Sequence, residues 1–191
     1  MEHSLWKFLV RAAVIVSTAA CTALPSAPPD NVVPLKNPSF NAGPDGKLAG
    51  WAAGEHLLGN SYTFAADPVN PRSGPTSGRI ERYGTEPFGL LDEQIRMKPE
   101  WRNKTLRLSG WLRSQDVDGV GGALMLRADG GSGQIIQWNF MDDNRVTGTR
   151  DWKQYSIDLK IPPDTFFFQV GVMLQGGGKL WVDDLQLELV D

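Results

Sequence analysis

Residues 166–190 read FFFQVGVMLQGGGKLWVDDLQLELV, and this stretch decides the fold class. Apolar residues occupy every second position from Phe166 to Leu174 and recur after Lys179. Such alternation is typical of β-strands that bury one face. Because three glycines separate the two runs, the stretch predicts two antiparallel strands joined by a turn. The side chains predicted to face the core are Phe166, Phe168, Val170, Val172 and Leu174 in the first strand, and Trp181, Leu185, Leu187 and Leu189 in the second.

Similar short runs continue upstream to residue 32. Further strands are predicted at 32–36, 56–65, 78–83, 88–97, 104–114, 122–128, 134–141 and 152–161. Glycine, proline, asparagine or aspartate separates them, and the 191 residues include 21 glycines and 13 prolines. Beyond the first twenty residues no stretch has a convincing helical period, although a short helical turn is predicted near 98–101. This pattern predicts one all-β domain, either a two-sheet sandwich or a barrel.

Alternation also predicts which side chains leave the core. Leu106, Leu108 and Leu112 share the inward phase of strand 104–114, so Trp111 and Arg113 should point outward. An outward tryptophan flanked by arginines can stack on a sugar ring, whose C–H face is apolar. The alternatives are Arg–Trp stacking on a solvated face or cover from a long loop.

Hydrogen-bonding side chains occupy the outward phases predicted for other strands. Leu124 and Leu126 are predicted to face inward opposite an outward Arg127, and the same reasoning places Ile136, Trp138 and Phe140 in the core. The sequence does not say whether these strands share a sheet with Trp111. The candidate ligand-binding residues are Trp111, Arg113, Arg127, Gln137, Asn139 and Gln169. The tryptophans predicted as core or corner residues are Trp51, Trp138, Trp152 and Trp181.

The first residues have the pattern of an export signal. Lys7 and Arg11 precede an apolar run at 12–20 that is too short to span a bilayer, so 1–20 is predicted to be a signal peptide. Cys21, the only cysteine, follows directly, and this arrangement resembles the lipobox of bacterial lipoproteins. The resemblance implies a lipid anchor in a bacterial membrane, the outer rather than the inner one because Thr22 is not aspartate. Plain cleavage that releases a secreted or periplasmic soluble domain is the alternative.

The segment after Cys21 separates the predicted anchor from the domain. Residues 21–34 are rich in proline and small residues and predict a semi-rigid tether. The domain is then predicted to span residues 35–191.

The C-terminal segments resemble one family. Residues 148–163 (GTRDWKQYSIDLKIPP) combine a W-x-x-Y strand with an I-P strand end, and residues 180–187 (LWVDDLQL) carry two aspartates between apolar residues. Together with Asn37-Pro-Ser-Phe40 and Trp51, they resemble galactose-binding-like jelly-roll domains, the fold of many carbohydrate-binding modules. The resemblance covers residues 37–190 and implies an all-β, two-sheet antiparallel jelly-roll sandwich with a carbohydrate ligand.

The resemblance also implies a structural Ca²⁺. In such modules the ion joins the aspartate at the position of Asp183 to the N-terminal segment, where Asn41 stands in place of the usual glutamate. Backbone carbonyls near Ser39 would complete the shell, because calcium takes six to eight oxygens. Asp183 could instead cap a bulge or pair with a basic residue.

Composition and motifs argue against several functions. A net charge of −3 gives no electrostatic footprint for nucleic acid. The domain has one histidine, His56, and no nucleophile elbow, and nothing pairs the carboxylates Glu81, Asp92, Glu93, Asp142 and Asp143 for glycoside hydrolysis. The sequence thus predicts a non-catalytic, envelope-anchored module that binds carbohydrate. The alternative is a structural or protein-interaction domain of the cell envelope without a sugar ligand.

Overall fold

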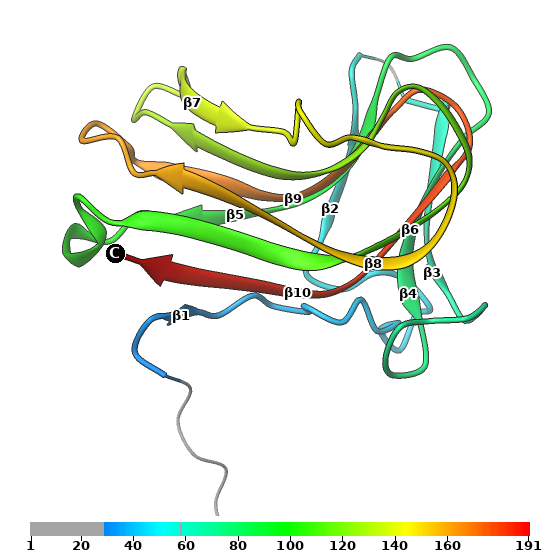
Figure 1. Ribbon diagram of the computed structural model, residues 1–191, viewed down its shortest axis with the longest axis horizontal. Coiled ribbons are helices and arrows are strands. Elements are labelled where there is room, and N and C mark those ends of the chain that lie inside the picture. The colour runs from blue at the N-terminus through cyan, green and yellow to red at the C-terminus, as the bar shows by residue number, and fades with distance from the viewer. Residues whose placement is uncertain (1–28, 58) are drawn as a thin grey trace, which may run out of the picture.

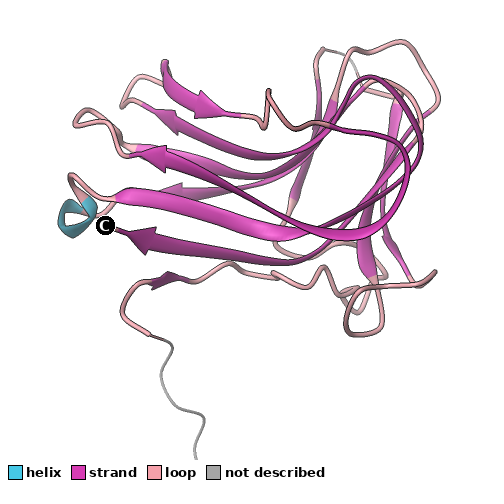
Figure 2. Ribbon diagram, viewed as in Figure 1, coloured by secondary structure: helices cyan, strands magenta, loops and turns pink. Residues whose placement is uncertain are grey.

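The computed structural model describes residues 29–57 and 59–191. These residues form ten strands and one 3₁₀ turn (Figures 1 and 2): β1 (Val32–Val33), β2 (Ala52–Glu55), β3 (Tyr62–Asp67), β4 (Ser77–Arg82), β5 (Gly89–Arg96), η1 (Pro99–Trp101), β6 (Thr105–Asp129), β7 (Ile135–Asn139), β8 (Val146–Lys160), β9 (Phe167–Gln175) and β10 (Lys179–Val190). The predicted signal peptide and Cys21 lie outside the described residues. No helix in the described part of the chain is long and apolar enough to cross a membrane.

The strands form two layers that share β6, and every pairing between them is antiparallel (Figure 1). The first sheet runs β8, N-terminal half of β6, β10, β4, β3, with β1 beside the C-terminal half of β10. The second sheet runs β2, β5, β9, C-terminal half of β6, β7. This arrangement confirms the predicted two-sheet sandwich.

The two strands predicted at 104–114 and 122–128 are one continuous strand of 25 residues. β6 leaves the first sheet and enters the second while β8 stays paired alongside it, with register shifts between Leu112 and Gly122. Gly119 and Gly121 have φ angles of 68° and 106°, a region that favours glycine, so the bend is built where side chains are absent.

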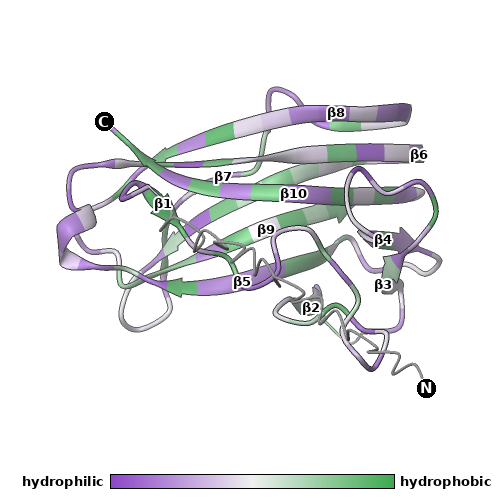
Figure 3. Ribbon diagram, turned by 90° about the horizontal axis from the view of Figure 1, so that it is seen from below, coloured by the Kyte–Doolittle hydropathy of each residue, from purple (hydrophilic) through white to green (hydrophobic). Residues whose placement is uncertain are grey.

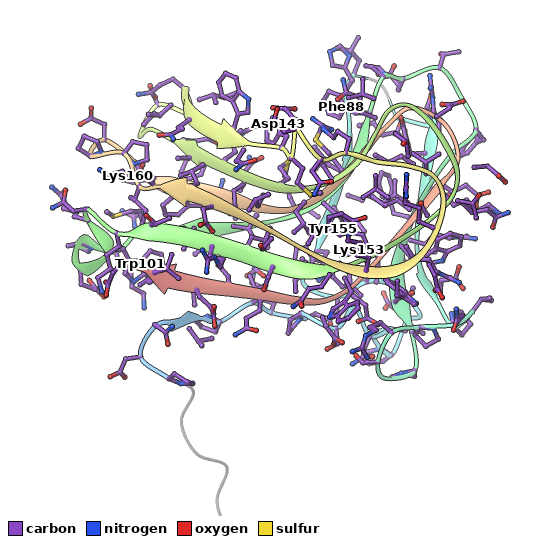
Figure 4. The ribbon with its side chains drawn as sticks, in the orientation of Figure 1. Phe88, Trp101, Asp143, Lys153, Tyr155 and Lys160 are labelled. Carbon is purple, nitrogen blue, oxygen red and sulfur yellow. The ribbon has the colours of Figure 1, made fainter. Side chains whose placement is uncertain are left out.

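The core lies between the layers, and most residues predicted to fill it do so. Those exposed by no more than 1% are Leu106, Leu108, Leu112, Leu124, Leu126, Phe168, Val170, Val172, Leu174 and Leu187. Figure 3 shows the alternation of apolar and polar residues along β6 and β10. Trp101 of the predicted helical turn closes one end of the core against Phe168, with ring centroids 6.4 Å apart (Figure 4).

The core also extends toward the predicted tether. Val32 and Val33 pair with Glu188 and Leu187 of β10, and the Val33 side chain is buried. The folded domain therefore includes Val32 and Val33, which lie within the predicted tether.

The prediction that Phe166 faces the core is wrong, because its side chain is 42% exposed. Phe166 precedes β9, and its backbone N–H donates to the Asp129 carbonyl at the end of the sheet. The ring lies under the Arg96 guanidinium, 4.2 Å from the guanidinium carbon.

The inward phase predicted around β7 is wrong for Trp138, although Phe140, just after the strand, packs against the core. Trp138 pairs directly with Arg127, and directly paired residues share a face, so Trp138 lies on the outer face of the second sheet. Its side chain is 54% exposed. Since β7 is the last strand of this sheet, its apolar phase meets solvent, and Gln137 and Asn139 take the phase of Ala128 and Leu126 instead.

A bulge in β10 reverses the phase predicted for Trp181 and Asp183. The register with β6 shifts between Asp183 and Gln186, and Asp184 adopts a φ of 49°. Leu180 and Val182 therefore fill the core before the bulge, while Trp181 and Asp183 lie on the outer face of the first sheet. Both are nevertheless buried, because a loop covers them.

Candidate functional site

The structure divides the candidate ligand-binding residues between the outer faces of the two sheets. Trp111 and Arg113 lie on the first sheet, paired with Asp183 and Trp181. Arg127 and Gln169 are paired with each other on the second sheet. Trp111 and Arg127 therefore cannot contact one sugar chain on one face.

A loop covers Trp111. The Arg72 guanidinium carbon lies 4.3 Å from the Trp111 ring centroid, and the Trp152 indole N–H donates to the Asn70 carbonyl at 2.9 Å. Arg113 donates to the Val69 carbonyl at 2.8 Å. These contacts hold the loop that follows β3 against the outer face of the first sheet. Stacking of Arg72 on Trp111 beneath this loop explains the position of Trp111 without a bound sugar.

Asn139 and Gln137 do not join either group. The Asn139 amide donates to the Asp158 carbonyl at 3.0 Å, beside a groove of about 320 Å³ whose lining includes Asp142, Asp143 and Asp158. Gln137 is exposed on the side of β7 that Trp138 does not occupy.

The outer face of the second sheet carries one row of side chains across four strands. The register joins Trp138 of β7, Arg127 of β6, Gln169 of β9 and Gln94 of β5. Since neighbouring strands lie about 4.8 Å apart, the row spans roughly 14 Å. We call these four residues the β7–β5 row.

A buried carboxylate orients the arginine of the β7–β5 row. Asp129 accepts two short hydrogen bonds from Arg127, 2.9 Å from Nε to Oδ1 and 2.7 Å from Nη2 to Oδ2. The Asp129 side chain is 1% exposed, whereas that of Arg127 is 23% exposed. A bidentate pair of this kind fixes the plane of the guanidinium and leaves its outer edge facing solvent.

The next row on the same face consists of Asp92, Gly171 and Met125, and it is less polar than the β7–β5 row. Gly171 separates Asp92 from Met125 across β9, and the Met125 side chain is buried. Burial raises the pKa of Asp92, and the charge of Arg127 opposes that rise. These two rows therefore place the Arg127 guanidinium, the Asp92 carboxylate and the amides of Gln94 and Gln169 beside the exposed indole of Trp138.

Trp138, Gln94 and Asp92 complete this face, but sequence reasoning did not select them as ligands. Trp138 was assigned to the core by alternation alone, and no phase was assigned to the strand that holds Asp92 and Gln94. Alternation gives no sign that β7 is the last strand of its sheet, where an apolar phase need not be covered, so the exposure of Trp138 could not have been found from it.

The predicted calcium ligands lie around one turn. Asp183 is fully buried, and its Oδ2 accepts the backbone N–H groups of Arg72 and Ser73 at 3.0 and 2.9 Å. Its Oδ1 accepts the Asp184 N–H at 2.9 Å. Gly74 follows Arg72 and Ser73 in this turn, and Asn41 packs against it. A Cβ added to Gly74 would lie 2.8 Å from Asn41 Oδ1.

These contacts give Asp183 the bulge-capping role that the sequence left open. Three of about four lone-pair positions of the carboxylate are filled, so one remains for a cation. Burial raises the pKa of Asp183 to about 6, and the backbone N–H group of Ser73 opposes that rise. No group of three or more His, Cys, Asp or Glu side chains placed to hold a metal occurs within 29–57 and 59–191. A calcium ion here would depend mainly on backbone carbonyls, and it stays a prediction.

Thermal unfolding tests whether calcium binds at this turn. A weak site, with a dissociation constant on the order of 1 mM, stabilises the native state by about 1 kcal/mol at 5 mM calcium. We expect calcium to raise the melting temperature of the native sequence by a few degrees over chelator, and Asp183→Asn to remove that increment. Superimposable melting curves of the native sequence in the two buffers would exclude the ion.

Comparisons with known proteins agree with this architecture. No protein-family model matches the chain. The chain is 27% identical over 148 residues to the uncharacterized HTH-type transcriptional regulator YbfP of Bacillus subtilis (strain 168). The match covers 76% of this chain and 49% of the regulator, so the chain spans about half the length of that curated relative.

Similar solved structures include binding modules and an enzyme. The CBM22-1 xylan-binding domain of Paenibacillus barcinonensis Xyn10C has a TM-score of 0.54 at 15% identity, covering 80% of this chain and 92% of that one. Family 16 carbohydrate-binding module 2 has a TM-score of 0.55 at 17% identity, covering 81% and 100%. The arabinose-bound α-L-arabinofuranosidase MgGH51 has a TM-score of 0.60 at 18% identity, covering 83% of this chain but 26% of the enzyme. The chain therefore has the jelly-roll β fold of carbohydrate-binding modules.

Proposed function

We propose that this protein is a non-catalytic module that binds carbohydrate on the outer face of its second sheet. The observation that carries the proposal is Trp138, a large aromatic side chain left 54% exposed in register with Arg127 and Gln169. An indole with one free face can stack on the C–H side of a sugar ring, and this contributes on the order of 1 kcal/mol beyond area burial.

The polar members of the face would orient the sugar. The Arg127 guanidinium and the amides of Gln94 and Gln169 offer donors, while Asp92 offers acceptor oxygens close to Arg127. Sugar hydroxyls both donate and accept hydrogen bonds, so this mixture suits them better than a face of one charge. A row of roughly 14 Å would accommodate about three sugar residues lying across the strands.

A screen of oligosaccharides tests this proposal. The folded chain is immobilised and exposed to a panel of neutral pentose and hexose oligosaccharides, and bound members are then titrated by calorimetry. We expect binding that strengthens from the disaccharide to the trisaccharide. A panel without any bound member would leave the alternative, a structural or protein-interaction domain, as the better account.

We also propose that the module is held at a bacterial membrane through Cys21, which supports a role in the extracytoplasmic envelope. The sequence around Cys21 supports this proposal, and Val32 marks where the described domain begins, eleven residues later. Eleven extended residues reach at most about 40 Å, which keeps the domain close to the membrane.

Loss of the anchor should be seen in cell fractions. We expect Cys21→Ser to move the protein from the membrane fraction to the soluble fraction, because the thiol that carries the lipid is gone. The matched variant Thr22→Ser should stay with the membranes. Mass spectrometry that finds an unmodified mature N-terminus elsewhere in the chain would contradict the proposal.

A further inference from the structure

A polar groove lies on the first sheet, away from the β7–β5 row. It has a volume of about 360 Å³, and its lining includes Arg113, Arg150, Asp151, Asn70, Gln115 and Trp181. Arg113 belongs to β6, Trp181 to β10, and Arg150 and Asp151 to β8, so three paired strands build it. The loop that fastens over Trp111 supplies Asn70.

Arg113 is held rigidly in this groove. Its guanidinium carbon lies 4.1 Å from the Trp181 ring centroid and 5.4 Å from that of Trp152. Its Nη2 donates to the Val69 carbonyl at 2.8 Å. Aromatic contacts and one backbone bond therefore fix the orientation of the guanidinium before any ligand arrives.

Within the described residues the arginines of the groove form no close ion pair, although the charges of Asp67 and Asp151 act on Arg113 from a greater distance. Among the described residues, ion pairs within 4.0 Å occupy Arg79, Arg107, Arg127 and Arg145, but neither Arg113 nor Arg150. Arg113 Nε is buried without a hydrogen-bond partner in the described structure and is out of reach of a ligand, so a ligand would have to contact the terminal nitrogens of the guanidinium. A partly desolvated guanidinium gains most from a carboxylate that can take two parallel N–H bonds.

The other polar residues of the groove, Asp151, Asn70 and Gln115, determine which kind of anion fits it. Asp151 is exposed beside Arg150, and it would repel a bare anion but can accept hydrogen bonds from hydroxyl groups. The amides of Asn70 and Gln115 can donate or accept. A ligand that carries both a carboxylate and neighbouring hydroxyls satisfies all of these groups, whereas an acidic peptide side chain does not.

We propose that this groove is a second binding site, for the carboxylate of an acidic sugar such as a uronic acid residue. The site goes beyond the proposed function, because it uses the opposite sheet and none of the residues of the β7–β5 row. The Arg113 and Arg150 guanidinium groups hold the carboxylate, and Asp151 accepts sugar hydroxyls. The module could then contact a neutral chain on one sheet and an acidic chain on the other.

The test compares trigalacturonic acid with its methyl ester, which has the same sugars without the charges. Titration calorimetry with the folded chain at low salt should show binding of the acid at least tenfold tighter than that of the ester. Affinity for the acid should fall as salt is raised, because an ion pair of this kind is screened. Equal affinities, or no binding of the acid, would overturn the proposal.

Single substitutions test whether the acidic sugar binds in the groove. Arg150→Gln should weaken binding of the acid at least fivefold, whereas Arg102→Gln, which also removes an exposed charge but lies outside the groove, should leave it unchanged. Trp138→Ala should also leave it unchanged, so failure of the neutral-sugar site does not affect this result. An Arg150→Gln variant that binds like the native protein, or loss of acid binding in Trp138→Ala, would overturn the assignment.

Discussion

Trp138→Ala should weaken binding of a neutral oligosaccharide at least tenfold. The indole is the only large aromatic side chain exposed within the described β7–β5 row, so its removal takes away the stacking surface. Tenfold corresponds to about 1.4 kcal/mol, which stacking together with lost contact area can supply. Calorimetric titration of the two proteins with the same oligosaccharide measures the ratio.

Two controls show whether the loss belongs to the site. Urea unfolding of Trp138→Ala should change by no more than about 1 kcal/mol, because a side chain 54% exposed contributes little to the core. Gln137→Ala, on the adjacent residue and the other side of β7, should bind normally. Unchanged affinity in Trp138→Ala would count against this face as the sugar site.

Asp183→Ala should lower the free energy of unfolding by about 3 kcal/mol. The substitution leaves the N–H groups of Arg72, Ser73 and Asp184 without their acceptor, and each buried unpaired donor costs about 1–3 kcal/mol unless water reaches it. The loop over Trp111 should loosen at the same time. Urea unfolding measures the stability, and hydrogen exchange at the Arg72 and Ser73 amides measures the loop.

Asp158→Ala is the matched control for Asp183→Ala. Arg107 holds the pKa of Asp158 below its usual value, through a hydrogen bond and its charge, although burial opposes this effect. Both side chains are nearly half exposed, and exposed pairs contribute only about 0.2–1 kcal/mol. A loss as small for Asp183→Ala as for Asp158→Ala would contradict the role assigned to the buried carboxylate.

The sequence predicted the fold because its strongest signal is local. Alternation along β6 and β9 identified core side chains such as Leu106, Leu124 and Val172, all of which are fully buried. That signal depends only on whether a strand has one covered face. Alternation fails where an irregularity in strand pairing changes which side chains face the core. Neither the bulge at Asp183 nor the bend near Gly119 can be recognised from the spacing of apolar residues.

The candidate site was harder to predict because it depends on which strands meet. Arg127 and Gln169 were selected correctly as outward residues, and the register brings them together. Trp111 was selected for the same reason, but the loop that covers it comes from residues 68–76, about forty positions earlier in the chain. Trp138 was missed because alternation reports a phase and not which side of the sheet is covered.

Carbohydrate binding on the outer face of the second sheet is tested by following the indole N–H signals in a ¹⁵N–¹H spectrum during titration with the tightest-binding neutral oligosaccharide. We expect the Trp138 signal to shift with the binding isotherm, together with the backbone amide signals of Arg127 and Gln169. The Trp111 and Trp181 signals, which belong to the covered face of the first sheet, should stay in place. Shifts at Trp111 or Trp181 with a stationary Trp138 signal would place the sugar on the first sheet instead.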